Sequence, residues 1–114
     1  MASSGIRDQV AIVGMGCTQF GERWDQGIDD LLTEAAVEAA ASASIPLHQI
    51  DAFWLGTMTS GVSGVTLSRP LKLDYKPVTR VEHYCATGSE AFRTACYAVA
   101  CGAYDTAWPS AWRS

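Results

Sequence analysis

The sequence lacks any dense cluster of positive charge. It holds 8 Lys and Arg residues against 12 Asp and Glu residues, which gives a formal net charge of −4 over 114 residues. Proteins that follow a nucleic-acid backbone concentrate Lys and Arg on one face or along one stripe, and no stretch of this chain does so. We therefore predict that the protein has no nucleic-acid partner.

Long hydrophobic runs are also missing. No stretch approaches the ~20 apolar residues that a helix needs to span a bilayer. The first residues, Met1 to Gly5, are polar and lead directly into an ordinary strand-like pattern, unlike a secretory signal. We expect no membrane association and a cytoplasmic location, where cysteine thiols stay reduced.

Metal-binding patterns are absent as well. Neither His48 nor His83 stands at a ligand-type spacing from a cysteine pair, so we predict no metal site and no bound cofactor. Hydrophobic residues make up 48% of the chain and charged residues 18%, a balance that favours a buried core over disorder. Cysteine occurs four times, with no Cys-x-x-Cys pair: Cys17, Cys85, Cys96 and Cys101.

Hydrophobic periodicity alternates between strand and helix patterns along the chain. Apolar residues recur at helical spacing from Ile28 to Ala43, which predicts one amphipathic helix. We expect the following elements: strand 9–16, helix 28–43, strand 50–57, loop 58–76, strand 77–84 and helix 89–102. This order predicts an α/β layered fold. The loop carries apolar residues and is expected to pack on something, such as a second subunit.

The last expected helix, 89–102, is apolar nearly all round. Only Glu90 and Arg93 are charged within it. A helix of this kind is typical of the buried core of a larger protein.

Gly14-Met15-Gly16 follows the first expected strand and invites a dinucleotide-binding interpretation. That fingerprint requires a third glycine at position 19 and a helix that begins there. Position 19 is Gln19, and no helical pattern follows it. The dinucleotide interpretation is therefore disfavoured.

Cys85 is the residue that the sequence singles out for chemistry. It closes the expected strand, and Gly88 and Ser89 open the next helix immediately afterwards. Helix N-termini carry unpaired N–H groups and partial positive charge, and both stabilise a thiolate, the nucleophilic form of cysteine. A strand-to-helix turn also holds a nucleophile in a fixed, accessible place. Cys85 is therefore our candidate catalytic residue.

Position alone leaves a second interpretation of Cys85 open. Free cysteines are among the most buried residues, and an inert thiol packed beneath the helix fits the same spacing. Cys96 and Cys101 lie inside the apolar helix and fit the inert role, which we also favour for Cys17. His83 would share one face of the strand with Cys85 and could act as its base, although such bases usually come from elsewhere in the fold.

The segment from Val81 to Ala91 reads Val-Glu-His-Tyr-Cys-Ala-Thr-Gly-Ser-Glu-Ala and leads into the apolar stretch 97–105. Together with 10–21 and 50–56, in the same order along the chain, it resembles the thiolase superfamily. The subgroup it resembles most is the sterol-carrier-protein-type thiolases, often named acetyl-CoA acetyltransferases in bacteria. We therefore expect residues 1–105 to form a partial N-terminal thiolase domain, an incomplete half of that family's layered α/β fold.

The resemblance implies a chemistry for Cys85. It would accept an acyl group from acyl-CoA as a thioester, and an oxyanion hole would stabilise the developing charge. A carbanion from a second acyl-CoA would then attack in a Claisen condensation, or CoA would cleave a 3-ketoacyl-CoA in the reverse direction. The resemblance also implies that the full-length protein is a homodimer or hetero-oligomer.

The chain departs from this family in two ways. Glu82 stands three residues before Cys85, where many thiolases have Asn, so the resemblance does not define the substrate class. The family's Gly-His-Pro histidine, its second cysteine and its oxyanion-region Asn would lie beyond residue 114. We therefore expect little or no thiolase activity from this chain alone. The alternative is a non-catalytic thiolase-like partner, or a module that binds lipid or acyl-CoA.

Residues 106–114 form an atypical tail. The family continues here with a buried apolar strand, whereas the tail is neither periodic nor strand-like, and Pro109 opposes a central strand. One GC-rich coding of Ala107 to Ser114, read in another frame, gives Leu-Ala-Val-Gly-Val-Glu-Lys, which suits the family's strand. We hypothesise that a frameshift created this tail; an unrelated natural C-terminus is the alternative.

Overall fold

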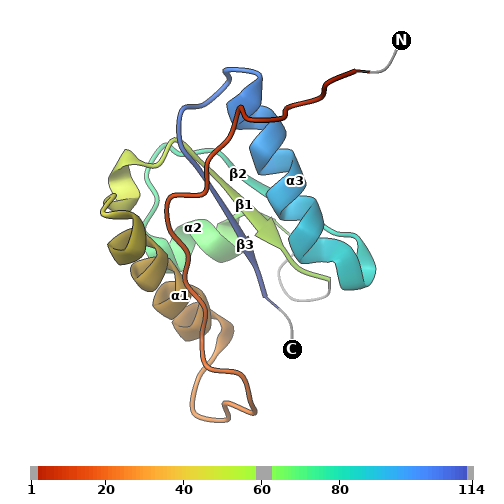
Figure 1. The fold of residues 1–114 in the computed structure, drawn as a ribbon. Coiled ribbons are helices and arrows are strands. Elements are labelled where there is room, and N and C mark those ends of the chain that lie inside the picture. The colour runs from red at the N-terminus through yellow and green to blue at the C-terminus, as the bar shows by residue number, and fades with distance from the viewer. Residues whose placement is uncertain (1–2, 59–62, 113–114) are drawn as a thin grey trace.

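The structure is a computed structural model that describes residues 3–58 and 63–112. In this part of the chain, three parallel strands form one sheet in the order β2-β1-β3 (Figure 1). The elements are, in chain order, α1 (Ile28–Ala43), the 3-10 helix η1 (Leu47–Gln49), β1 (Ala52–Gly56), α2 (Val65–Leu71), β2 (Val78–Val81), the 3-10 helix η2 (Tyr84–Ala86), α3 (Thr87–Ala100) and β3 (Ala107–Ala111).

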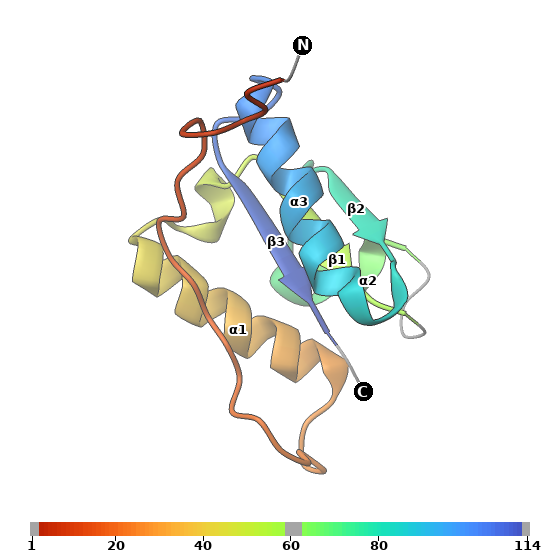
Figure 2. The same ribbon diagram turned by 45° about the vertical axis from the view of Figure 1, so that its right-hand side comes forward.

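Helices cover both faces of the sheet, so the α/β layered prediction is confirmed (Figure 2). Because side chains alternate along a strand, neighbours on β1 enter different layers. One layer packs against α1 and α2 through a buried apolar cluster: Leu32, Ile50, Phe53, Leu55 and Leu67. The other packs against α3 through a second cluster: Ala52, Trp54, Ala91 and Ala95. β1 is therefore buried along its whole length.

Helix α1 forms where the apolar stripe predicts it. Its first turn carries Asp29 and Asp30, whose negative charge suits the helix N-terminus. The Asp30 carboxylate also accepts a hydrogen bond from the N–H of Gly27 at 3.1 Å. The stripe faces the core, where Leu32 and Ala36 are buried.

The predicted strand at 9–16 is wrong, because residues 10–19 have no regular secondary structure. This segment runs alongside α1 instead (Figures 1 and 2). Its backbone finds acceptors on helix side chains: the N–H of Met15 donates to Ser42 Oγ at 3.2 Å. Ile12 and Met15 are 71% and 74% exposed. An apolar run predicts a strand, but only a neighbouring strand can complete its hydrogen bonding.

The two glycines of Gly14-Met15-Gly16 allow the N-terminal segment to lie close to α1. A Cβ on Gly14 would meet the backbone nitrogen of Ala43 at 2.5 Å. A Cβ on Gly16 would meet the carbonyl oxygen of Ala35 at 2.3 Å. Contacts this short are not tolerated, so both positions require glycine to lie against α1.

The predicted loop 58–76 contains a helix, α2, which the sequence prediction missed. Residues 59–62 of the predicted loop lie outside the described part of the chain. The apolar character of the segment is explained by Leu67, which is fully buried in the core of this same chain. Pro70 lies within the last turn of α2 and gave the stretch its loop-like composition. The segment therefore packs within the chain, through Leu67.

The prediction that the tail is not strand-like is also wrong. β3 pairs in parallel with β1, and Pro109 lies opposite Trp54. The N–H of Trp112 donates to the carbonyl of Gly56 at 3.0 Å. Because backbone groups alternate in direction along a strand, the nitrogen of Pro109 faces away from β1. β3 is an edge strand in the described sheet, and an edge strand tolerates proline there.

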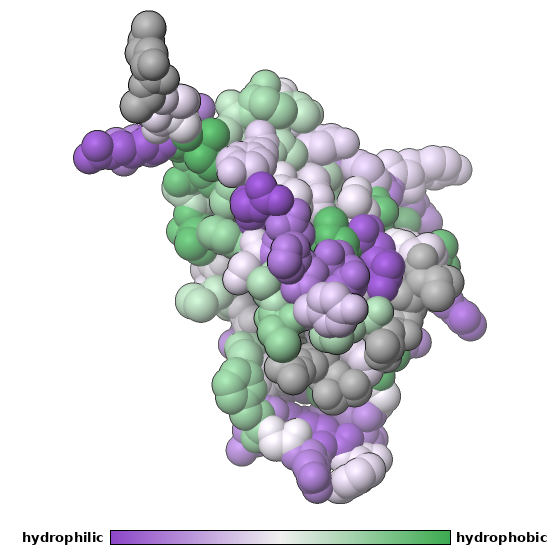
Figure 3. Space-filling view, turned by 90° about the vertical axis from the view of Figure 1, so that its right-hand side faces the viewer, coloured by the Kyte–Doolittle hydropathy of each residue, from purple (hydrophilic) through white to green (hydrophobic). Residues whose placement is uncertain are grey.

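Helix α3 forms as predicted, but it is not buried all round. Its buried residues are Thr87, Ala91 and Ala95, which form one face. On the other side, Phe92 and Tyr97 are 44% and 47% exposed. Figure 3 views the side of the molecule on which α3 lies and shows hydrophobic residues interspersed with hydrophilic ones. In this chain α3 is a surface helix with apolar residues on its outer face.

Candidate active site

Cys85 lies in a tight turn between β2 and α3. β2 ends at Val81, and α3 begins at Thr87. The predicted strand 77–84 is therefore shorter than expected, and Cys85 belongs to the single 3-10 turn η2. The Cys85 side chain is exposed, so the structure contradicts the buried packing that was the alternative for this residue.

The turn sits at the carboxyl edge of the parallel sheet. It follows the end of β2. Thr87, the residue after the turn, packs against the end of β1, because a Cβ on Gly56 would meet the Thr87 carbonyl oxygen at 2.9 Å. Gly88 lies close to Ala111, the last residue of β3. Open α/β sheets bind their ligands outside the carboxyl ends of the strands. Cys85 therefore lies at the edge of the sheet where such folds place their sites.

The backbone immediately before Cys85 is unusual. Tyr84 has a φ of 47°, in the left-handed region that bulky residues rarely adopt. A residue held in this region costs about 1–3 kcal/mol, so the surrounding contacts must maintain it. The Glu82 carboxylate accepts a hydrogen bond from the N–H of Tyr84. Glu82, which stands at the position where many thiolases have Asn, thus stabilises the turn.

Further hydrogen bonds close the turn across Tyr84. The N–H of Ala86 donates to the carbonyl of His83 at 2.9 Å. The hydroxyl of Thr87 accepts a hydrogen bond from the N–H of His83 at 2.9 Å and donates one to the carbonyl of Tyr84 at 2.6 Å. Sequence reasoning missed Thr87 as a site residue. Its place two residues after the candidate nucleophile, at the start of a helix, was the available signal.

His83 does not pair with Cys85 as the sequence suggested. The suggestion relied on strand alternation, which ends with β2 at Val81. Within residues 3–58 and 63–112, no hydrogen bond joins the imidazole of His83 to the thiol of Cys85. His83 contributes its backbone to the turn through the N–H and carbonyl groups described above.

The first turn of α3 also carries an ion pair. The guanidinium of Arg93 donates to the Glu90 carboxylate at 2.6 Å. This hydrogen bond lowers the pKa of Glu90 below its ordinary value, and the charge of His83 acts in the same direction. Glu90 therefore stays ionised at the N-terminus of α3, where a carboxylate suits the helix dipole.

The other cysteines lie away from this turn. Cys17 is exposed in the N-terminal segment, and Cys101 is exposed at the end of α3, so the buried packing expected of both is wrong. Cys96 is partly buried within α3. None of these three lies between a strand and the start of a helix.

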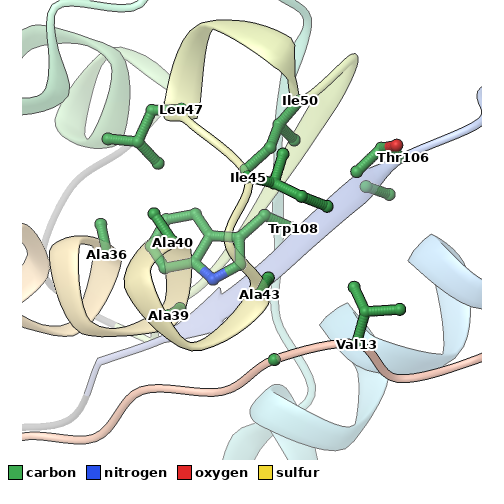
Figure 4. A pocket seen from close by; sticks show the side chains of 12 residues that line it. Val13, Ala36, Ala39, Ala40, Ala43, Ile45, Leu47, Ile50, Thr106 and Trp108 are labelled. Atoms are coloured by element: carbon green, nitrogen blue, oxygen red, sulfur yellow. The ribbon is translucent and has the colours of Figure 1, made fainter.

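A small cavity opens between α1, β3 and the N-terminal segment (Figure 4). Its volume is about 50 Å³, and among its twelve lining residues Thr106 and the indole N–H of Trp108 supply the polar side-chain groups. The indole of Trp108 lies in its wall opposite the alanine face of α1. With no titratable or nucleophilic side chain among its lining residues, it is a packing feature and not a second candidate site.

Within residues 3–58 and 63–112, no group of three or more His, Cys, Asp or Glu residues could hold a metal ion. None of the helices described is long and apolar enough to cross a bilayer.

Residues 10–108 match the family described as "Thiolase, N-terminal domain". The chain belongs to the thiolase N-terminal domain family. This match contains the whole turn with Cys85 and most of the sheet. The resemblance noted in the sequence is thus confirmed over nearly all of its range.

Sequence similarity to longer proteins supports the same family assignment. The chain is 40% identical over 106 residues to an acetyl-CoA acetyltransferase from Methanocaldococcus jannaschii, and 36% identical to one from Methanothermobacter thermautotrophicus. Each alignment covers 88% of this chain and 27% of the relative. Bovine sterol carrier protein 2 is 33% identical over 96 residues, which cover 79% of this chain and 17% of that protein. The chain thus spans about a quarter of the length of the two acetyltransferases.

Solved structures show the same fold. A 3-oxoacyl-[acyl-carrier-protein] synthase III from Aquifex aeolicus VF5 superposes with a TM-score of 0.60 at 18% identity, over 70% of this chain and 27% of that one. The priming β-ketosynthase of the R1128 polyketide pathway gives 0.62 at 24% identity, over 72% of this chain and 26% of that one. The layered α/β arrangement is therefore that of the N-terminal part of a thiolase-like fold.

Proposed function

We propose that this chain carries the acyl-accepting nucleophile of a thiolase-type acyltransferase, and that this nucleophile is Cys85. One observation carries the proposal: the chain's match to the thiolase N-terminal domain contains an exposed cysteine in a strand–turn–helix elbow at the carboxyl edge of the sheet. Acyl-CoA is the proposed substrate, in line with the similarity to two acetyl-CoA acetyltransferases.

The proposed step is a transthioesterification. The thiolate of Cys85 attacks the carbonyl carbon of acyl-CoA, a new carbon–sulfur bond forms, and the bond to the sulfur of CoA breaks. CoA leaves as a thiolate and takes a proton from solvent. The partial positive charge at the start of α3 favours the attacking thiolate. The acyl-cysteine that results divides one difficult condensation into two easier steps.

The second half of the reaction needs acid–base groups, which we propose lie in the part of the full-length relatives that this chain does not cover. A Claisen condensation requires a base to form the carbanion, and thiolytic cleavage of a 3-ketoacyl-CoA requires an acid to return the proton. No hydrogen bond pairs Cys85 with a base in the described part of the chain. We therefore propose that the chain by itself performs acylation of Cys85 and little turnover. Assembly as a homodimer or hetero-oligomer and a cytoplasmic location remain proposals for the full-length protein.

A second candidate function is a non-catalytic thiolase-like partner, or a module that binds lipid or acyl-CoA. The similarity to sterol carrier protein 2 favours it. The same exposed Cys85 would then contact bound acyl-CoA without accepting the acyl group.

Acylation of Cys85 separates the two candidates. We expect the purified chain, incubated with acetyl-CoA, to gain one acetyl group at Cys85 and to release one equivalent of CoA, measured by peptide mass spectrometry and a thiol assay. Cys85→Ala should abolish both signals. Cys101→Ala is the matched control, because Cys101 is also exposed and lies just past the opposite end of α3. Binding of acetyl-CoA without acetylation would favour the binding module, and acetylation of Cys17 to the same extent would contradict a special role for Cys85.

A further inference from the structure

Thr87 stands out in the turn around Cys85 because it is buried. Residues 82–86 are all exposed, whereas Thr87 is only 6% exposed. It lies two residues after the proposed nucleophile and is the first residue of α3. Burial of a polar side chain is costly unless its hydroxyl is hydrogen-bonded, so the contacts of this side chain define its role.

The hydroxyl of Thr87 holds the backbone on both sides of Tyr84. It accepts a hydrogen bond from the N–H of His83 at 2.9 Å and donates one to the carbonyl of Tyr84 at 2.6 Å. Tyr84 has a φ of 47°, a conformation that persists only where neighbouring contacts impose it. Cys85 follows directly, so the orientation of the peptide that Tyr84 shares with Cys85 decides where the thiol lies.

The rest of Thr87 is fixed against the sheet. A Cβ on Gly56 would meet both the Thr87 methyl carbon and its carbonyl oxygen at 2.9 Å, so the last residue of β1 leaves no space behind Thr87. One side chain thus connects the rigid end of the central strand to the turn that carries the thiol. Hydrogen bonding fixes one side of Thr87, and close packing fixes the other.

We propose that Thr87 is a positioning residue for Cys85: its hydroxyl locks the left-handed turn at Tyr84 and so holds the thiol exposed at the N-terminus of α3. This inference rests on the proposed function and extends it to a residue that does not itself touch the substrate. Nucleophiles need such support, because a reacting atom displaced by about 1 Å can cost about a hundredfold in rate.

The experiment measures how fast iodoacetamide labels each cysteine of the 114-residue chain, resolved by peptide mass spectrometry across neutral to alkaline pH. Thr87→Val keeps the shape of the side chain and removes the hydroxyl, whereas Thr87→Ser keeps the hydroxyl and removes the methyl group. Cys17 lies in the N-terminal segment and serves as the internal reference for an exposed thiol. Circular dichroism reports whether each variant folds.

We expect Thr87→Val to slow labelling of Cys85 about tenfold relative to Cys17, the effect of losing one or two hydrogen bonds. Thr87→Ser should restore labelling to within about twofold of wild type. A wild-type rate at Cys85 in Thr87→Val, or an equal loss in Thr87→Ser, would overturn the positioning role. If Thr87→Val does not fold, Gly56→Ala decides instead, because its Cβ would displace Thr87: slower labelling of Cys85 supports the positioning role, and a wild-type rate overturns it.

The proposed function fails in a different way. If Cys85 of the wild-type chain reacts no faster than Cys17, the thiol is not activated, and the proposal that Cys85 is a nucleophile loses its support together with this one. If wild-type Cys85 reacts faster than Cys17 but does not respond to Thr87→Val, only the role of Thr87 is refuted. Gly56→Ala gives an independent measurement, because its methyl group would displace Thr87 without removing the hydroxyl; we expect slower labelling of Cys85 here too.

Discussion

Asp51 and Thr106 form a reciprocal pair that joins the start of β1 to the start of β3. The N–H of Asp51 donates to the carbonyl of Thr106 at 3.0 Å, and the N–H of Thr106 donates to the Asp51 carboxylate at 3.1 Å. The same carboxylate oxygen accepts a hydrogen bond from the N–H of Asp105 at 3.0 Å. This pair anchors the tail to the sheet at the point where β3 begins.

Removal of the Asp51 carboxylate should loosen β3. We expect Asp51→Ala to lower the free energy of unfolding by about 1–2 kcal/mol, because two backbone N–H groups lose their charged acceptor. Urea denaturation followed by tryptophan fluorescence measures this, since Trp108 and Trp112 lie in or beside β3. Asp74→Ala is the matched control at an exposed acidic residue, and it should change stability by less than about 0.5 kcal/mol. Equal stability of the two variants would contradict the anchoring role.

Gly16 should tolerate no side chain. Gly16→Ala would place a Cβ 2.3 Å from the carbonyl oxygen of Ala35, so the N-terminal segment would have to move away from α1. We expect a loss of about 1–3 kcal/mol in unfolding free energy, as for other overpacked sites. Gly27→Ala is the control, because a Cβ there meets only Asp30 Oδ2 at 4.0 Å. A dinucleotide site at Gly14-Met15-Gly16 would bind nucleotide in a calorimetric titration. We expect no such binding.

Thiolase turnover should be absent or very low in the 114-residue chain. Acylation uses Cys85 as its nucleophile, whereas release of the product requires acid–base groups that we expect beyond residue 114. The measurement is CoA-dependent cleavage of acetoacetyl-CoA by the purified chain, followed by loss of the substrate's absorbance. Robust, repeated turnover that disappears in Cys85→Ala would show that the chain supplies those groups itself.

The origin of residues 106–114 is a prediction about the gene. A frameshift within the codons of Ala107 to Ser114 would replace the apolar strand expected of the family with the observed Trp-Pro-Ser-Ala-Trp sequence. Sequencing the locus tests this: an alternative frame that continues with thiolase-like sequence is the expected result. An uninterrupted gene with no such frame would contradict the frameshift hypothesis. The division between a thiolase domain at 1–105 and an atypical tail stays a prediction until then.

Much of the fold is present in local sequence patterns. The apolar stripe from Ile28 to Ala43 predicted α1 because a helix satisfies its backbone hydrogen bonds within itself, so its pattern is local. The run at 50–57 and the apolar segment at 89–102 likewise predicted β1 and α3. Cys85 became a candidate from its position between a strand and a helix N-terminus, which is a local property too, although position alone left a buried, inert role open.

Other features needed the tertiary structure, because they depend on which segments meet. A strand needs a neighbouring strand to complete its hydrogen bonds. Residues 9–16 were predicted as a strand, but they lie along α1 without a partner strand. The segment around Pro109 was predicted as irregular, but it pairs with β1. The turn at Cys85 also combines a local feature with one that depends on tertiary contacts. Sequence alone selected the cysteine, but only three-dimensional packing brought Gly56 against Thr87 and placed the Thr87 hydroxyl across the turn that holds the thiol.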